Sequence, residues 1–356
     1  VNNADGTSSA INPEPFVITD FSTGSGGDVL DYGDLLRNAT TSYDGSNPFS
    51  SGFLSLDQNG SDTLLSFDPD GSSETNGSST VLAILKNTTA AAFTADNFNP
   101  NFPTDGSPAT AQTITGTALA DTLIGGFGDD TIDGLGGNDV IDGQAGSDLI
   151  RGGDGNDTIE GNFGNDRLYG DAGDDTISDD QGSNILDGGS GNDNLTSHSL
   201  SGDHSLIGGS GNDQLNATGL VLDLDGGTGN DQLSINGSLN VGGSEQYVQG
   251  GQATLKGGSG EDNLQADNYS TAELRGGAGN DYLETYEVKD AVLYGEAGDD
   301  NLYAYISGYT TQDTDGNYKL PQSAYLDAGD GNDNLSIRGR LYLDSGSSTA
   351  TAIGGL

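Results

Sequence analysis

A nine-residue repeat constrains this chain more than any other feature of its sequence. Consecutive units, each similar to GGDGNDTIE at residues 152–160, fill residues 116–196. The sixth position of the unit is Asp in every copy except one, where it is Asn184, and the eighth position is always Leu or Ile. A unit this short can bury its apolar residue only against its neighbours. The repeat therefore predicts a coil of stacked short strands.

The repeat continues after Thr196 with a different spacing. Glycine-rich hexapeptides such as GGSGND begin at residues 208, 226, 257, 276, 295 and 328. Leu stands two residues before each of these hexapeptides, in the register of the earlier eighth position. The same coil is therefore expected to continue, with every second Gly-Asp loop replaced by plain sequence. Two longer spacers, 235–256 and 304–327, predict loops or hairpins that leave the coil, where a partner site is expected.

Composition indicates what such a coil can bind. The formal net charge is −45, and nearly all of the 55 acidic residues are Asp, whereas only 31% of the residues are hydrophobic. This charge argues against nucleic acid as a partner. The absence of Cys excludes disulfides and thiolate metal sites, and two His are too few for a histidine metal cage. No apolar run reaches the length of a transmembrane segment.

The chemistry of the loop favours calcium. Glycine allows the chain to turn with its carbonyl oxygens pointing inward, and the Asp adds a carboxylate to that ring of oxygens. Six to eight oxygen ligands in a flexible loop are typical of a calcium site. The alternative is that these Asp residues only solvate turns. Stacked turns about 4.8 Å apart would then repel by roughly 0.9 kcal/mol per neighbouring pair even in water, so a cation is expected between them.

GGDGNDTIE and its neighbours resemble the GGxGxDxUx nonapeptide of RTX proteins. The resemblance implies an all-β fold, a right-handed parallel β-roll that forms a calcium-filled β-solenoid, with two nonapeptides in each turn. It also implies that each Ca²⁺ lies between loops one turn apart, bound by backbone carbonyls and the position-six Asp. The implied metal ligands are Asp130, Asp139, Asp148, Asp157, Asp166, Asp175, Asp193, Asp213, Asp231, Asp262, Asp281, Asp300 and Asp333.

The spacing also predicts how the calcium ions are distributed. Loops alternate between the two edges of the coil, so ten loops, from residue 134 to residue 328, are expected on one edge. The other edge receives the loops that begin at residues 125, 143 and 161. Asn184 and the GTALAD loop before Asp121 depart from the motif, so about 11–13 ions are expected in all. Beyond them, the second edge is expected to be held by side-chain packing and hydrogen bonds.

Proline residues divide the chain. We expect a small β module at residues 1–100, a linker at 101–112 and the β-roll at 113–356. The strings FVITDF, FLSLD, DTLLSFD and TVLAILKN predict short strands in the first module. This module resembles the C-terminal module of type I secreted RTX proteins, although here it precedes the repeats. It is expected either to cap the coil or to end an earlier repeat block. DPDG at 68–71 and DTDG at 313–316 are interpreted as β-turns.

No catalytic arrangement is evident, and the chain is predicted not to be an enzyme. His198 and His204 are interpreted as solvent-exposed turn residues, and neither a nucleophile elbow nor a phosphate loop is present. Ten of the 14 tyrosines lie at or after Tyr269. They favour a cross-strand ladder on a half-exposed sheet over a sugar-binding face.

The predicted function is that of a calcium-binding structural RTX module that folds on calcium binding outside a bacterial cell. The resemblance places it in an exported adhesin or surface-layer protein, secreted or held at the cell surface. Its expected partners are calcium ions and a cell-surface or glycan ligand. The alternative is the non-catalytic secretion and folding module of an RTX exoenzyme. An ice-binding coil is a third hypothesis, but position three of the later loops lacks the uniform row of residues that it needs.

Overall fold

The computed structural model separates into two compact units, Val1–Thr110 and Ala111–Leu356, each described here by itself. The residues that the structure describes are 15–24, 26–31, 47–68, 71, 79–94, 97–99, 104, 110–199, 202–241, 244–247, 251–306, 323–339 and 349–353.

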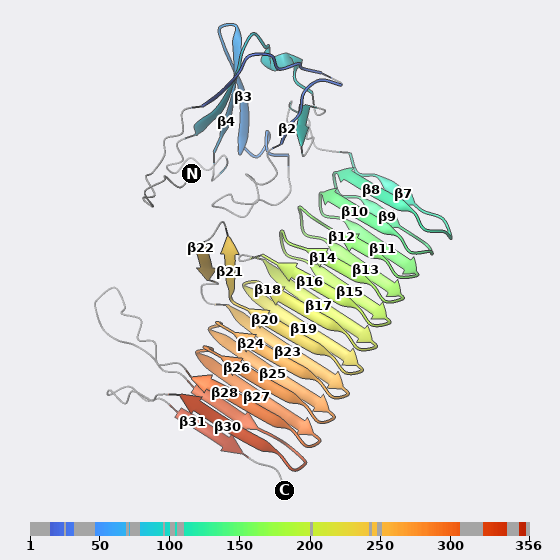
Figure 1. Cartoon of the computed structure of the whole chain (residues 1–356), viewed down its shortest axis with the longest axis vertical. Helices are drawn as coiled ribbons and strands as arrows, with labels where there is room; N and C mark the ends of the chain where they lie inside the picture. The colour runs from blue at the N-terminus through green and yellow to red at the C-terminus, as the bar shows by residue number, and fades with distance from the viewer. Residues whose placement is uncertain are drawn as a thin grey trace, which may run out of the picture. The chain divides into compact units, whose positions relative to one another are not determined.

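The first unit is a small β module (Figure 1). Its main sheet has the order β1-β5-β4-β3, in which β1 pairs parallel to β5 and the other pairs are antiparallel. Phe21 stacks on Phe93, whose ring centroid is 5.9 Å from that of Phe98, and these side chains are buried, as are Leu54 and Leu85. The strands confirm those predicted from the sequence, whereas residues 69–70 of the DPDG turn lie outside the described residues. The elements are β1 (Phe16–Ile18), β2 (Leu30–Asp31), β3 (Leu54–Asn59), β4 (Asp62–Phe67), β5 (Thr80–Leu85), η1 (Ala90–Ala92) and β6 (Phe98–Asn99).

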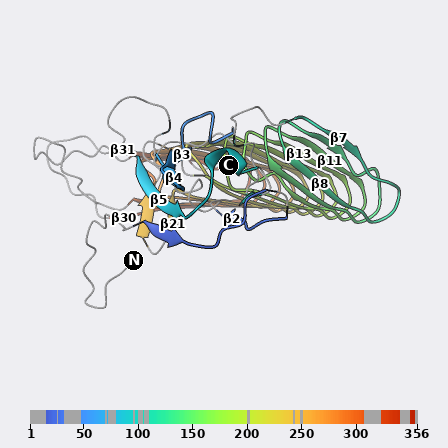
Figure 2. The ribbon, with the colours of Figure 1, turned by 90° about the horizontal axis from the view of Figure 1, so that it is seen from above.

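The second unit is a coil of stacked turns whose strands form two parallel sheets (Figures 1 and 2). The twelve-strand sheet contains β7 (Thr113–Thr115), β9 (Thr131–Asp133), β11 (Leu149–Asp154), β13 (Arg167–Ala172), β15 (Ile185–Ser190), β17 (Asp203–Ser210), β19 (Val221–Thr228), β23 (Gln252–Ser259), β25 (Thr271–Ala278), β27 (Asp290–Ala297), β29 (Ser323–Asp327) and β31 (Thr349–Ile353).

The eleven-strand sheet contains β8 (Thr122–Phe127), β10 (Val140–Ala145), β12 (Thr158–Glu160), β14 (Thr176–Asp179), β16 (Asn194–His198), β18 (Gln214–Thr218), β20 (Gln232–Asn236), β24 (Asn263–Asp267), β26 (Tyr282–Tyr286), β28 (Asn301–Ile306) and β30 (Asn334–Gly339). The predicted fold class, an all-β parallel β-solenoid preceded by a small β module, is confirmed. Among the described residues, no helix has the length and apolar character needed to cross a membrane.

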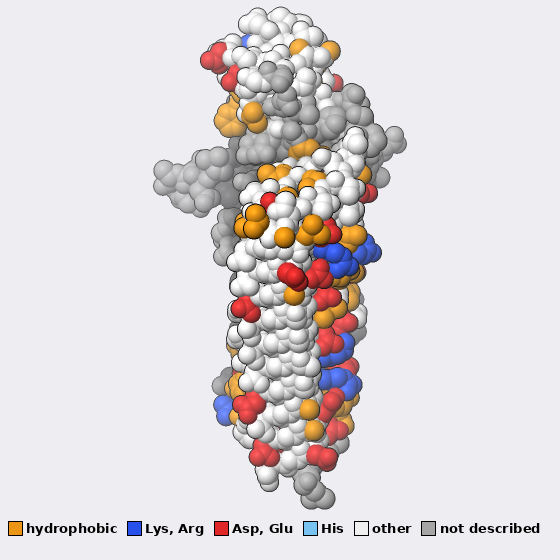
Figure 3. Space-filling model, turned by 90° about the vertical axis from the view of Figure 1, so that its right-hand side faces the viewer, with side chains coloured by type: hydrophobic (Ala, Val, Ile, Leu, Met, Phe, Trp, Pro, Cys, Tyr) orange, Lys and Arg blue, Asp and Glu red, His pale blue; other side chains and the backbone are white. Residues whose placement is uncertain are grey.

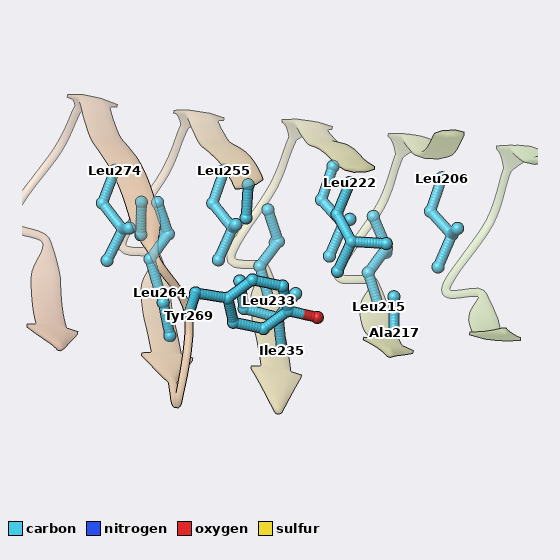
Figure 4. Packing of buried hydrophobic residues seen from close by; sticks show 14 of the residues in the cluster. Leu206, Leu215, Ala217, Leu222, Leu233, Ile235, Leu255, Leu264, Tyr269 and Leu274 are labelled. Atoms are coloured by element: carbon cyan, nitrogen blue, oxygen red, sulfur yellow. The ribbon is translucent and has the colours of Figure 1, made fainter. Parts of the chain in front are cut away.

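The core of the coil is a column of position-eight side chains. Successive residues of a strand point to opposite faces, so in each three-residue strand only the middle side chain enters the interior. Ile141 pairs with Ile159 and Ile150 with Leu168, one turn apart, and these side chains are at most 1% exposed. Figure 4 shows the same column farther along, where Leu206, Leu255 and Leu274 are labelled and Leu224 lies between the first two in the strand register. The turns before residue 196 thus have a thin apolar core.

The strands lengthen after residue 196, and the core widens with them. β17, β19, β23, β25 and β27 each have eight residues, which brings a second inward-facing side chain into each turn. Leu222 on β19 is of this kind, and Ile235 is a second inward-facing side chain on β20 of the other sheet. Tyr269 lies beside them with its hydroxyl 3.3 Å from the backbone N and O of Gly219 (Figure 4). Packing and hydrogen bonds therefore occupy the edge where the plain spacers replace Gly-Asp loops, as the sequence predicts.

The first long spacer forms the predicted hairpin, because β21 (Ser238–Val241) pairs antiparallel with β22 (Ser244–Tyr247). Most of the second spacer lies outside the described residues. The tyrosine ladder is confirmed on the outer faces of the sheets. The ring centroids of Tyr282 and Tyr303 are 5.3 Å apart, and those of Tyr286 and Tyr305 are 6.1 Å apart.

Candidate metal-binding edges of the coil

The predicted aspartates lie in two rows, one along each edge of the coil. The first edge is where the chain passes from the twelve-strand sheet to the eleven-strand sheet, and the second edge is where it returns. After the first loop on each edge, every position-six Asp accepts a hydrogen bond at Oδ1 from the backbone N–H of its counterpart one turn earlier, whereas Asp130 Oδ1 accepts the N–H of Gln112. For example, the N–H of Asp139 donates to Asp157 (2.8 Å), and that of Asp157 donates to Asp175 (2.7 Å).

This ladder fixes which residues share an edge. On the second edge it joins Asp130, Asp148 and Asp166 and ends at the amide oxygen of Asn184. The first edge holds the others, in the order Asp121, Asp139, Asp157, Asp175, Asp193, Asp213, Asp231, Asp262, Asp281, Asp300 and Asp333.

The second carboxylate oxygen of each predicted ligand has no hydrogen-bond partner. Oδ2 is buried and unpartnered in all thirteen predicted aspartates. Twelve of these side chains are 0–2% exposed, and Asp333, in the last loop, is half-buried. Buried polar atoms are almost always hydrogen-bonded, because leaving one unpaired costs about 1–3 kcal/mol, and more for a charged group. A regular series of exceptions therefore indicates that another species pairs with these oxygens.

The surroundings of Oδ2 contain oxygen atoms. A Cβ placed on Gly134 would collide both with Asp139 Oδ2 and with the carbonyl oxygen of Gly152, one turn later. A carboxylate and a carbonyl from adjacent turns thus face the same small space, which only glycine at position one leaves open. Oxygen atoms alone are the donor set that calcium prefers. The residues fit Ca²⁺ and offer neither nitrogen nor sulfur for a softer metal.

Backbone oxygens are necessary to complete such a site. Within the part of the chain that the structure describes, no three Asp, Glu, His or Cys side chains gather as a purely side-chain metal site requires. Position four of the repeat requires glycine for two reasons. Gly155 has a φ of 131°, and a Cβ there would collide with the carbonyl oxygen of Gly137 in the preceding turn. The stacked loops therefore approach each other more closely than any side chain at position four would allow.

Burial shifts the protonation of the carboxylates. Desolvation raises the pKa of Asp148 to about 8 and that of Asp175, Asp231 and Asp281 to about 7, and repulsion from neighbouring aspartates adds to the shift. Hydrogen bonds from the backbone N–H groups act in the opposite direction and do not cancel it. In the coil without metal, Asp148, Asp175, Asp231 and Asp281 would therefore hold protons near neutral pH, where calcium can replace them.

A second ladder runs on the outer side of the loops through position five. The side-chain oxygen of Asn138 accepts the backbone N–H of Asn156 (3.1 Å), and Asn212 accepts that of Asn230 (2.7 Å). These bonds run in the direction opposite to those of the aspartate ladder. The recurrent Asn-Asp pair of the repeat thus supplies acceptors for turns on both sides, which sequence reasoning missed because the partners are 18 residues apart.

Asp179 is a further buried carboxylate that sequence reasoning missed. It stands at position one, where most copies have glycine, in the same unit in which Asn184 replaces the position-six Asp. Asp179 is 2% exposed, and its Oδ2 is unpartnered. Desolvation, together with the neighbouring Asp166, raises the pKa of Asp179 well above its usual range. The sequence did contain a signal for this residue, because positions one and six depart from the repeat in the same unit.

The two histidines correct the sequence interpretation. His198 and His204 lie on strands, not in exposed turns, and His204 is only 3% exposed. Its Nδ1 lies 3.0 Å from Ser197 Oγ, and burial lowers the pKa of His204 to about 4, so that the ring is neutral. Where the Gly-Asp loop is lost, the strand extends and its alternate residues turn inward. Because Ser197 is also buried, this pair packs the interior and has no access to a substrate.

The first loop of the coil differs from the others. The Oδ2 atom of Asp121 accepts hydrogen bonds from the backbone N (2.6 Å) and the hydroxyl (2.9 Å) of Thr117. The Oδ2 atom of Asp121 thus has protein partners, whereas the Oδ2 atoms of the thirteen predicted ligands have none. The GTALAD loop, which departs from the motif in sequence, therefore also differs in structure, because its Asp is hydrogen-bonded within its own loop.

Comparison with models of protein families finds a match over part of the coil. The model of the RTX calcium-binding nonapeptide repeat (4 copies) matches residues 115–150, 142–177, 160–195, 198–219, 273–287 and 291–305. A search of the curated proteins finds no match. The matched residues cover both the turns with two Gly-Asp loops and several of the later turns with one.

The raised pKa values predict an unusual response to acid in the calcium-depleted protein. Unfolded Asp has a pKa of about 3.9, whereas several buried aspartates have values of about 6 to 8. The stability that protonation gives to the folded state is therefore lost as the pH rises through this window. Lowering the pH from 8 to 5 should increase the β-sheet signal in circular dichroism. Loss of signal, or no change, would contradict this prediction.

Proposed function

We propose that this chain, which carries RTX calcium-binding nonapeptide repeats in several segments within residues 115–305, is a calcium-folded structural module of an exported bacterial protein. A surface adhesin or surface-layer protein is the favoured setting. The observation that carries the proposal is the pair of aspartate rows, in which every predicted ligand has one buried oxygen without a partner. The chemistry that calcium supplies there is the neutralisation of these carboxylates.

We assign the metal ligands to the position-six aspartates together with backbone carbonyls of adjacent loops. The position-one glycine holds open the space that the carboxylate and the carbonyl share, as at Gly134. The assigned aspartates are Asp130, Asp139, Asp148, Asp157, Asp166, Asp175, Asp193, Asp213, Asp231, Asp262, Asp281, Asp300 and Asp333.

Calcium-coupled folding follows from this arrangement. Without cations, a chain of net charge −45 with 60 glycines pays a high entropic cost to fold and gains a thin core in the turns before residue 196. The chain would thus stay unfolded where calcium is scarce and become a stiff coil outside the cell. This behaviour suits export of an unfolded chain, and the first unit, which resembles a secretion module, fits the same route.

Removal of calcium is expected to unfold the repeat region. With a chelator, circular dichroism should show disorder in this region, and addition of calcium should restore the β-sheet signal. Extracellular calcium modules have dissociation constants of about 10⁻⁴–10⁻³ M, so the midpoint should lie near that range. Identical spectra with and without chelator would refute calcium-coupled folding.

Two aspartates of one loop separate coordination from general charge. Asp157 is 2% exposed and lies at the ligand position, whereas Asp154 lies at position three with its side chain in solvent. Asp157→Ala should raise the calcium concentration needed for folding several-fold, and Asp154→Ala, which removes the same charge, should change it little. Equal shifts in the circular dichroism titration would show that charge alone controls folding.

The adhesin setting predicts binding to a surface ligand. The calcium-loaded chain should bind glycans or intact cells in a binding screen, and the chelator should abolish that binding. The hairpin of β21 and β22, which leaves the coil, supplies a matched deletion variant. If the loaded chain binds neither glycans nor cells, the module of an exoenzyme becomes the better assignment.

A further inference from the structure

The last Gly-Asp loop on the second edge departs from the repeat at both of its ends. Residues 179–184 read DDQGSN, with Asp179 in place of the position-one glycine and Asn184 in place of the position-six aspartate. If calcium binds only between position-six aspartates, the gap between this loop and the loop at 161–166 has one carboxylate, that of Asp166, instead of two. The side chain of Asp179 changes that conclusion.

Asp179 and Asp166 point toward the same space. A Cβ on Gly161 would collide with the Oδ2 atoms of both residues. Neither Oδ2 receives a hydrogen bond from an N–H group or a hydroxyl, although the two carboxyl groups are close enough to share a proton, and the two side chains are 2% and 1% exposed, respectively. In the preceding gap, a Cβ on Gly143 would instead meet Asp148 Oδ2 and the carbonyl oxygen of Gly161. The carboxylate of Asp179 therefore faces the space that a backbone carbonyl faces elsewhere.

The remaining atoms of the loop hold Asp179 in this position. Its Oδ1 accepts the backbone N–H of Gln181 (3.0 Å), which leaves Oδ2 directed inward. Asn184 keeps its place in the ladder, because its Oδ1 accepts the N–H of Asp166 (2.9 Å) while its amide nitrogen donates to the carbonyl of Gln181 (2.9 Å). Asn184 thus preserves the geometry of the repeat without its charge.

We propose that Asp179 is a calcium ligand and that the gap between residues 161–166 and 179–184 binds a third calcium ion on the second edge. The carboxylate has moved from position six to position one, so the gap again contains two carboxylates, those of Asp166 and Asp179. This inference rests on the proposed role of the aspartate rows. A buried carboxylate pair without a cation would be strongly unfavourable, and calcium is the cation for which the donors are suited.

The same site ends the row of calcium ions on this edge. Immediately beyond it lies the neutral ring of His204, whose Nδ1 is 3.4 Å from the backbone N of Asn184. From there on, the interior at this edge is filled by side chains such as Leu222 and Tyr269. Asp179 thus lies at the boundary between metal-bound and packed turns of the coil.

Calcium stoichiometry tests the proposal. The full chain is saturated with calcium, and the bound ions are counted by native mass spectrometry. Asp179→Gly restores the repeat glycine and should lose one calcium per chain. The double variant Asp179→Gly with Asn184→Asp restores the usual loop and should regain that ion. Asp180→Asn, which removes a neighbouring charge whose side chain is 69% exposed, should keep the full count.

An unchanged count in Asp179→Gly would overturn the proposal and indicate that Asp166 and Asp179 share a proton instead. If Asp179→Gly fails to fold, Asp179→Asn keeps the side-chain shape and the acceptor for Gln181, and it should also lose one ion. A wild-type chain without bound calcium would refute the proposed function. A wild-type chain that binds calcium in the same number as both Asp179 variants would refute this inference alone.

Discussion

Repulsion between buried carboxylates is the constraint on which the rest of the coil depends. Adjacent strands lie about 4.8 Å apart, and at an effective dielectric constant of about 20 two charges at that spacing repel by about 3.5 kcal/mol. Hydrogen bonds from a backbone N–H to the Oδ1 atom of the next turn, such as that from Asp139 to Asp157, fix the carboxylates of neighbouring turns at about this separation. The other oxygen is buried and has no protein partner, and a cation bound there would remove this repulsion.

The coil resolves this constraint in two ways along its length. Before residue 196, both edges carry carboxylates, and the interior between them is mainly the column that includes Ile141 and Ile159. Beyond residue 202, the first edge keeps its aspartates, whereas the second edge has longer strands with buried Leu222 and Ile235. In the later turns the row of aspartates therefore lies along one edge only, and packed side chains fill the other (Figure 4).

The surface of the first edge shows few of the carboxylates, because the position-six aspartates are buried. Figure 3 faces this edge, which consists largely of backbone and small polar side chains with few carboxylates in view. Most of the visible charge follows the neighbouring sheet, where Lys and Arg alternate with Asp and Glu. Lys256 with Asp223 and Arg275 with Glu296 form such pairs across strands. Exposed pairs of this kind contribute little stability, so the buried rows govern the coil.

The sequence predicted the features that the period itself determines. Position eight gave the inward column, position six gave the two rows of aspartates, and the loop spacing gave the edge on which each row lies. Asp179 and His204 were missed because each occupies a place where the repeat changes phase. A position-one side chain has no counterpart in the other loops, and loss of a loop lengthens the strand so that His204 turns inward. Only the three-dimensional pairing of turns shows these directions.

Anomalous scattering from crystals grown in calcium would locate every bound ion and thereby show whether the aspartate rows bind calcium. The account predicts ions in successive gaps along the first edge from residue 139 to residue 333. It predicts them on the second edge only between residues 130 and 184. Calcium on the second edge beyond residue 202, or empty gaps along most of the first edge at saturating calcium, would contradict the account.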